Sequence, residues 1–328
     1  MTSLPLKREI VNGIESFATL PMWAGFIVFM LGMLAVDMLL LGGRQAHKVS
    51  VKEALGWSLT WVVLALLFCA LLWCYLDHHT GREFANQKSL EFLSGYLIEK
   101  SLSVDNIFVF LVIFGYFAVP AEMQRRVLLY GVVGAIVMRA VMILLGAWLI
   151  AQFSWVMYLF GAFLVITGIK MLIFADQESD LNDNALLKFL RRHLRISDGY
   201  DGEKFFTRHH GLRYFTPLVL VLILIEISDL IFAVDSIPAI FAITTDPFIV
   251  FTSNMFAIMG LRALYFLLAD VAHRFQYLKY GLAVVLVFIG GKMLLAYWFH
   301  IPVLLSLLLV ALILLISVVL SLMLSHKR

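Results

Sequence analysis

The sequence predicts an all-α polytopic membrane protein with about nine transmembrane helices. Of its 328 residues, 62% are hydrophobic and 14% are charged, and the mean hydropathy is +0.95. Soluble domains carry about 25% charged and about 45–50% apolar residues, so this composition indicates a membrane protein. The net charge of +3 comes from the loops and gives no indication of a nucleic-acid partner.

Nine apolar runs are long enough to cross the roughly 30 Å hydrocarbon core of a bilayer. We interpret each run as one helix of a single transmembrane domain over residues 1–328. The connections are short except for 176–213, which we expect to be a soluble loop with a short amphipathic helix over 185–195. The runs lie at about 22–43, 57–76, 91–117, 126–150, 155–175, 214–244, 248–268, 279–299 and 302–324.

Lysine and arginine are divided unevenly between the two sides of the predicted bundle. The side that holds 176–213 and the C-terminus has 16 of them, and the side that holds the N-terminus has 4. An excess of basic residues marks the cytoplasmic loops of membrane proteins. We therefore expect the N-terminus outside, and the C-terminus and the 176–213 loop in the cytoplasm.

The stretch 225–243 is apolar enough for a bilayer, yet it contains Glu226, Asp229 and Asp235. A carboxylate at the bilayer centre costs about 2.5–3.5 kcal/mol on insertion scales. Three of them in one helix imply a partner charge, a water-filled cavity or a bound cation. Pro238 cannot donate a backbone hydrogen bond, so we expect the helix to kink or break beside Asp235. Broken helices at mid-depth supply ion sites in membrane carriers.

The acidic pattern occurs twice in the chain. Glu99 and Asp105 lie six residues apart, as do Asp229 and Asp235. The second acid of each pair is followed at once by a polar residue, in the frames VDNI and VDSI. These polar residues are Asn106 and Ser236.

The two halves also share basic residues further along the chain. Arg139 and Arg262 each precede an alanine, and Lys170 and Lys292 each precede Met-Leu, 31 residues later in one half and 30 in the other. Three helices, an odd number, separate equivalent positions. We therefore expect two inverted three-helix repeats with a polar site at their interface, as in secondary transporters. The repeats cover about 91–175 and 214–299.

The polar side chains inside the predicted spans are mostly oxygen donors, which suit Mg²⁺, Ca²⁺ or Mn²⁺. On a regular helix, side chains seven residues apart share a face, whereas those six apart do not. One ion can therefore reach both acids of a pair only where the helix unwinds. The candidate metal ligands are Asp105, Asp235, Asp229, Glu99, Asn106, Ser236, Glu226 and Asp37, and the supporting partners are Asn254, Arg139, Arg262, Lys170 and Lys292.

Each candidate also has a purely structural interpretation. The acids can form buried ion pairs with Arg139 or Arg262 that only hold helices together, and for Asp37 this interpretation weighs as much as ion contact. The amides and the hydroxyl can serve as interhelical hydrogen-bonding groups. Lys170 and Lys292 can extend toward the membrane interface or pair with acids.

The chain resembles the TerC family, in particular its Alx branch of bacterial inner-membrane proteins, over about the first eight predicted helices. That family is similar to cation exporters of the LysE type. The resemblance implies a bacterial inner-membrane location, Mn²⁺ as the exported ion, and ligands among the two repeated acidic motifs. The segments that carry it are GYLIEKSLSVDNIFVF, EISDLIFAVDSIPAIFAITTDPFIVFTSN, FAIMGLRALYFLL and LKYGLAVVLVFIGGKMLL.

The residues alone predict a carrier of divalent cations, and the resemblance adds manganese and the export direction. The chain has no GxxxxGK[ST] motif, so we expect secondary transport with protons as the candidate counter-ion. We expect no enzymatic activity and no permanent cofactor. The expected partners are the lipid bilayer and the cation, and a homo-oligomer is compatible with the sequence.

Two other functional classes are alternatives. One is a non-transporting membrane scaffold in metal-stress or tellurite resistance, or in the metalation of exported proteins. The other is an intramembrane aspartyl protease, whose Gly-x-Gly-Asp frame is absent from the sequence.

Overall fold

The fold comes from a computed structural model, which describes residues 9–11, 14–40, 50–153, 155–173, 185–197, 199–209, 212–269, 278–295 and 301–325. Nearly all of this part of the chain is helical. The helices are α1 Leu20–Leu40, α2 Val51–His79, α3 Arg82–Tyr116, α4 Ala121–Gln152, α5 Val156–Ile173, α6 Ala185–His193, α7 Pro217–Phe241, α8 Pro247–Met259, α9 Leu261–Leu268, α10 Leu278–Leu294 and α11 Val303–Ser325. Two short hairpins pair β1 Glu9–Val11 with β2 Ile14–Ser16, and β3 Phe206–His209 with β4 Leu212–Phe215.

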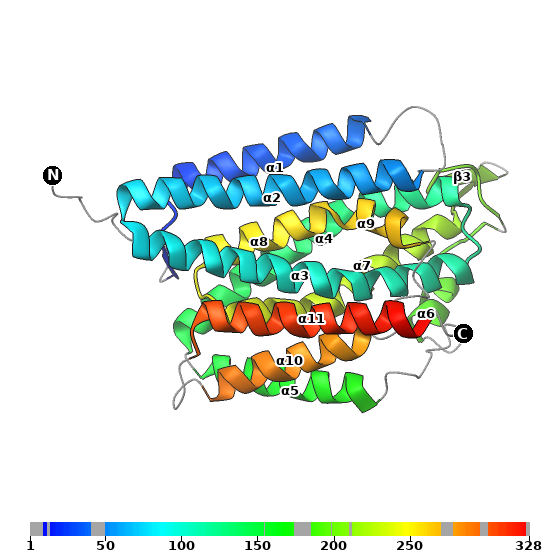
Figure 1. Ribbon diagram of the computed structural model, residues 1–328. Helices are drawn as coiled ribbons and strands as arrows, with labels where there is room; N and C mark the ends of the chain where they lie inside the picture. Colours follow the sequence, from blue (N-terminus) through cyan, green and yellow to red (C-terminus); the bar gives the residue numbers. More distant parts are fainter. Residues whose placement is uncertain are drawn as a thin grey trace.

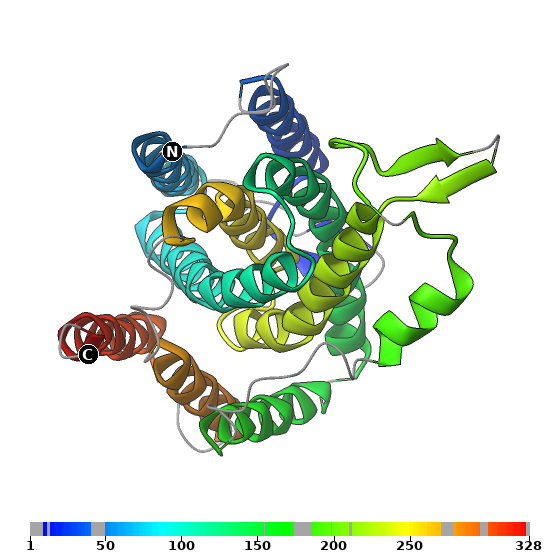
Figure 2. The same cartoon turned by 90° about the vertical axis from the view of Figure 1, so that its right-hand side faces the viewer.

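The long helices lie side by side as one bundle (Figure 1). α1 begins at the left-hand end of the bundle in that view, and α11 ends at the right-hand end, where α6 and the β3–β4 hairpin also lie. Seen along its length, the bundle has α3, α4, α7, α8 and α9 at its centre (Figure 2). The pair α1 and α2 lies along one edge, and α5, α10 and α11 lie along the opposite edge.

The described helices are those of a multi-pass membrane protein. Seven segments of this part of the chain are long and apolar enough to cross a bilayer: α1, α2, α4, α5, α7, α8 together with α9, and α11. The helices α3 and α10 occupy the other two predicted ranges, and the count of nine crossings stays a prediction. In the α8–α9 span 94% of the residues are buried, whereas 17% are buried in the α1 span. The helices α8 and α9 are therefore surrounded by protein.

The break expected beside Asp235 is absent, because α7 continues through Pro238 to Phe241. Pro238 lies in the last turn, so the one hydrogen bond that it cannot donate, to the Val234 carbonyl, is near the C-terminal end of the helix. The interruption lies instead at Gly260, between α8 and α9. There Lys100 of α3 donates a long 3.5 Å hydrogen bond to the carbonyl of Ala257, and a Cβ at position 260 would overlap the Lys100 ammonium.

The helices α5 and α10 approach each other closely through glycine. A Cβ added at Gly290 of α10 would lie 2.6 Å from the carbonyl oxygen of Gly161 in α5. A Cβ added at Gly168 of α5 would lie 2.8 Å from the carbonyl oxygen of Ala283 in α10. Small residues therefore let the two backbones touch, as they do in many helix pairs in membranes.

The long connection between α5 and α7 contains more structure than the sequence indicated. The short amphipathic helix expected over 185–195 is present as α6. The sequence does not predict the antiparallel β3–β4 hairpin, because its strands are only four residues long. In its register Phe206 faces Phe215, and the two rings pack 5.2 Å apart.

Candidate functional site

A buried arginine joins three of the central helices. The guanidinium of Arg139, on α4, is paired with Oε1 of Glu99 on α3. Its Nη2 and Nε atoms donate to the two carboxylate oxygens of Asp229 on α7, at 2.9 and 3.2 Å. Its Nη1 atom also donates to Oδ1 of Asn254 on α8, at 2.8 Å. The bidentate contact with Asp229 fixes both the position and the plane of the guanidinium.

Two further residues complete the polar cluster around Arg139. Asn106 lies seven residues after Glu99, on the same face of α3, and its Nδ2 atom donates to Oδ1 of Asp229 at 3.3 Å. Ser236 lies seven residues after Asp229, and its hydroxyl is 3.5 Å from Nη1 of Arg139. Helical periodicity therefore brings the acid and the polar residue of each motif together, as the seven-residue spacing predicts.

The cluster lies halfway along its helices. α3 has 17 residues on either side of Glu99, and α7 has 12 residues on either side of Asp229. Their exposed fractions are 0% and 2%, and that of Arg139 is 1%. A site at mid-depth between helices is where membrane carriers bind their substrates.

The cluster holds more negative charge than Arg139 neutralises, and it contains unused polar atoms. With Glu99 and Asp229 ionised, its formal charge is −1. Within the part of the chain that the structure describes, no hydrogen bond reaches Oε2 of Glu99, Oδ1 of Asn106 or Nδ2 of Asn254. Buried polar atoms are nearly always hydrogen-bonded, so orphaned oxygens beside an excess negative charge are available ligands for a cation or for water.

The other predicted acids do not join this cluster. The half-buried Asp235 lies beside Thr167 and Lys170 of α5, because the six-residue step from Asp229 turns it to another face of α7. Glu226 is half-buried, and its carboxylate rests on Gly134 of α4. Asp105 belongs to α3, but its side chain lies outside the described residues.

The remaining candidates form separate pairs. Asp37 of α1 accepts a 2.5 Å hydrogen bond from Nη2 of Arg262 in α9, and both residues are buried. One acid with one arginine leaves no excess charge, so this geometry favours the structural interpretation of Asp37. Lys292 of α10 donates to the hydroxyl of Ser306 in α11 at 2.9 Å, whereas Lys170 is exposed. Among the described residues, no group of three or more His, Cys, Asp or Glu side chains is placed to hold a metal ion.

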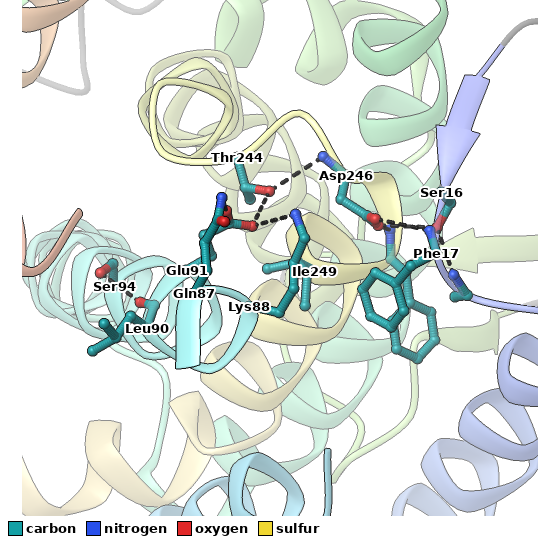
Figure 3. Close-up of polar contacts among 12 residues, drawn as sticks. Ser16, Phe17, Gln87, Lys88, Leu90, Glu91, Ser94, Thr244, Asp246 and Ile249 are labelled. Atoms are coloured by element: carbon teal, nitrogen blue, oxygen red, sulfur yellow. Dashed lines mark hydrogen bonds and ion pairs between the residues drawn. The ribbon is translucent and has the colours of Figure 1, made fainter. Parts of the chain in front are cut away.

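A second polar network lies at the left-hand end of the bundle, and the sequence did not point to it. The buried Glu91 of α3 accepts hydrogen bonds from Lys88 at 2.7 Å and from Thr244 at 2.6 Å (Figure 3). Glu91 precedes Glu99 by eight residues, which is about 12 Å along α3. The network is therefore more than two helical turns from the cluster around Arg139.

Asp246 connects this network to the N-terminal segment. Its carboxylate accepts hydrogen bonds from the Ser16 hydroxyl at 3.0 Å and from the Phe17 N–H at 3.1 Å, and it also caps α8 (Figure 3). Burial raises the pKa of the Asp246 carboxyl, and Lys88 and these donors oppose that rise. The Asp-Pro pair at 246–247 is a helix-start signal, but it does not reveal a contact with residues 230 positions earlier.

Comparison with known proteins identifies the family. The family described as integral membrane protein TerC matches residues 84–328, about three quarters of the chain. The chain belongs to the TerC family. The match begins at the start of α3 and includes every residue of the cluster around Arg139, whereas Asp37, Ser16 and Phe17 precede it.

TerC relatives align with most of the chain. Alx of Escherichia coli strain K12, named as a proposed membrane-bound redox modulator, is 61% identical over 286 residues, which is 87% of this chain and 89% of that protein. Alx of Salmonella typhi, which has the same name, is 57% identical over 307 residues, 94% and 95% of the two chains. An uncharacterised membrane protein of Myxococcus xanthus is 49% identical over 305 residues, 93% of each chain. No solved structure gives a significant match.

Proposed function

We propose that this TerC-family protein is a secondary transporter that exports divalent cations, and Mn²⁺ in particular, from the cytoplasm. One observation carries the proposal: two buried carboxylates and their amide neighbours, halfway along the central helices, exceed the charge of Arg139 and leave oxygen atoms without partners. Keeping such a cluster in a membrane protein is costly, and intramembrane acids generally mark an ion pathway.

The chemistry of the donors supports a hard cation. Carboxylate, amide and hydroxyl oxygens suit Mg²⁺, Ca²⁺ and Mn²⁺ better than Cu⁺ or Zn²⁺, which prefer sulfur or imidazole ligands. The choice of manganese and the direction of transport rest on the TerC resemblance. Protons are the proposed counter-ions, because the sequence has no GxxxxGK[ST] motif and a proton gradient can drive secondary export.

The contacts between helices support the proposed pair of inverted repeats. In the proposed repeats, α3 corresponds to α7, and α4 corresponds to α8. α3 packs on α8, and α7 packs on α4, so each contact is the counterpart of the other. In the α5–α10 pair, the close contact of Gly161 with Gly290 corresponds to the contact of Ala283 with Gly168. We further propose that α3 and α10 cross the membrane, which gives nine crossings with the N-terminus outside and the C-terminus inside.

Transport by the purified protein in liposomes tests the proposal. We expect wild-type protein to carry radiolabelled Mn²⁺ across the bilayer and Asp229→Asn to lose this activity while still inserting. The matched control is Asp77→Asn, since Asp77 pairs with Arg82 away from the cluster and should not affect flux. Wild-type protein that inserts and yet carries no Mn²⁺ would contradict the proposal.

The alternative is a membrane scaffold that carries no ions. The observation in its favour is that Arg139 is bonded to both acids, an arrangement that can serve only to hold α3, α4 and α7 together. In that case Asp229→Asn should reduce the amount of folded protein, and no variant should show Mn²⁺ flux.

A further inference from the structure

The guanidinium of Arg139 contacts the same carboxylate oxygens that would coordinate a metal ion. It donates to both carboxylate oxygens of Asp229 and is paired with one oxygen of Glu99. A hard divalent cation needs such oxygens at about 2.0–2.6 Å, closer than the guanidinium nitrogens now stand to Asp229. The guanidinium and the metal therefore compete for one set of ligands.

Electrostatics leads to the same exclusion. Without counting the half-buried Glu226, a divalent cation added beside Arg139 would change the formal charge of the buried cluster from −1 to +1. If the guanidinium withdraws, the metal and the two carboxylates are neutral together. A buried uncompensated charge is strongly unfavourable, so metal binding favours the departure of Arg139.

α7 provides a second acceptor for the departing guanidinium. Glu226 precedes Asp229 by three residues, so the two side chains are neighbours on one face of the helix. Its carboxylate lies against Gly134, on the same helix as Arg139 and five residues before it. Among the described residues, Glu226 has no hydrogen-bond or ion-pair partner.

We propose that Arg139 is a tethered cation that exchanges with the transported metal. It pairs with Glu99 and Asp229 when the metal is absent, and it moves to Glu226 when the metal binds. This inference rests on the proposed function and assigns the step that releases the ion. The returning guanidinium expels the metal, so a site with two carboxylates does not retain its cargo.

The test compares Mn²⁺ binding with Mn²⁺ flux. In Arg139→Gln, equilibrium dialysis of the purified protein against radiolabelled Mn²⁺ should show binding that is tighter by about tenfold or more, since a competing charge in a low-dielectric site has been removed. Flux in liposomes should fall, because nothing expels the ion. Arg139→Lys keeps the charge and should recover part of the flux. The matched control is Arg82→Gln, which removes an arginine that pairs with Asp77 outside the cluster and should leave Mn²⁺ affinity unchanged.

Glu226 supplies the second arm, which does not depend on the stability of Arg139→Gln. Glu226→Gln should weaken Mn²⁺ binding, because the guanidinium loses its alternative partner. In an Arg139→Met background, which has no positive charge to relocate, the same substitution should have a much smaller effect.

The outcomes separate the two proposals. Wild-type protein that neither binds nor carries Mn²⁺ overturns the proposed function itself. If the wild-type protein binds and carries Mn²⁺, two results would overturn only the proposed exchange of Arg139 with the metal. One is weaker Mn²⁺ binding by Arg139→Gln, and the other is a Glu226→Gln substitution that weakens binding equally in both backgrounds. The last result would make Glu226 a direct ligand.

Discussion

Gly290 lies where α5 and α10 approach most closely, and an alanine there should separate them. Its Cβ would stand 2.6 Å from the Gly161 carbonyl oxygen and 2.9 Å from the Cβ of Leu164. The neighbouring Gly291 has nothing within 4 Å of its would-be Cβ. Both substitutions gain about the same helix propensity, up to about 1 kcal/mol, so their difference isolates the steric cost. Overpacking of this kind costs about 1–3 kcal/mol.

The two variants should therefore differ in thermal stability in the same detergent. We expect Gly290→Ala to unfold at a lower temperature than wild type and Gly291→Ala to unfold at the same temperature or slightly higher. A Gly290→Ala variant at least as stable as Gly291→Ala would show that α5 and α10 are not packed backbone to backbone at this position.

Three further predictions concern the rest of the chain. Asp246→Ala removes a helix cap and the acceptor of the Phe17 N–H, so we expect the free energy of unfolding to fall by about 1–3 kcal/mol. Amide hydrogen exchange at residues 16–18, measured by mass spectrometry, should become faster. Unchanged exchange there would refute the contact between Asp246 and the N-terminal segment. Asp37→Asn leaves Arg262 buried without its carboxylate partner, so stability should fall by about 3–5 kcal/mol while Mn²⁺ affinity stays unchanged, and reduced affinity in a stable variant would restore Asp37 as a ligand. In liposomes, Cd²⁺, Co²⁺ or Fe²⁺ should inhibit Mn²⁺ flux at concentrations near that of Mn²⁺, and Mg²⁺ only in large excess; equal inhibition by Mg²⁺ would indicate a generic divalent site.

Helical periodicity made part of the cluster predictable. The seven-residue spacings of Glu99 to Asn106 and of Asp229 to Ser236 place each pair on one helix face, and both pairs belong to the cluster around Arg139. The same reasoning separated Asp235 from Asp229, and Asp235 indeed lies against α5.

The choice of partners could not be predicted, because it depends on how distant helices pack. Either Arg139 or Arg262 could have paired with Glu99 and Asp229, and the packing of the helices brings both acids to Arg139. The contact of Asp246 with Ser16 joins residues 230 positions apart, and no local pattern signals it. The break expected beside Asp235 is absent, since only one hydrogen bond is lost at Pro238 and α7 continues to Phe241.

The most direct test is an experimental structure determined with bound Mn²⁺, with the metal located by its anomalous scattering. The account predicts a manganese ion between Glu99 and Asp229, at about 2.0–2.6 Å from their oxygens, with the guanidinium of Arg139 displaced toward Glu226. Manganese bound elsewhere, with Arg139 still paired to both acids under conditions in which the protein carries Mn²⁺, would contradict it.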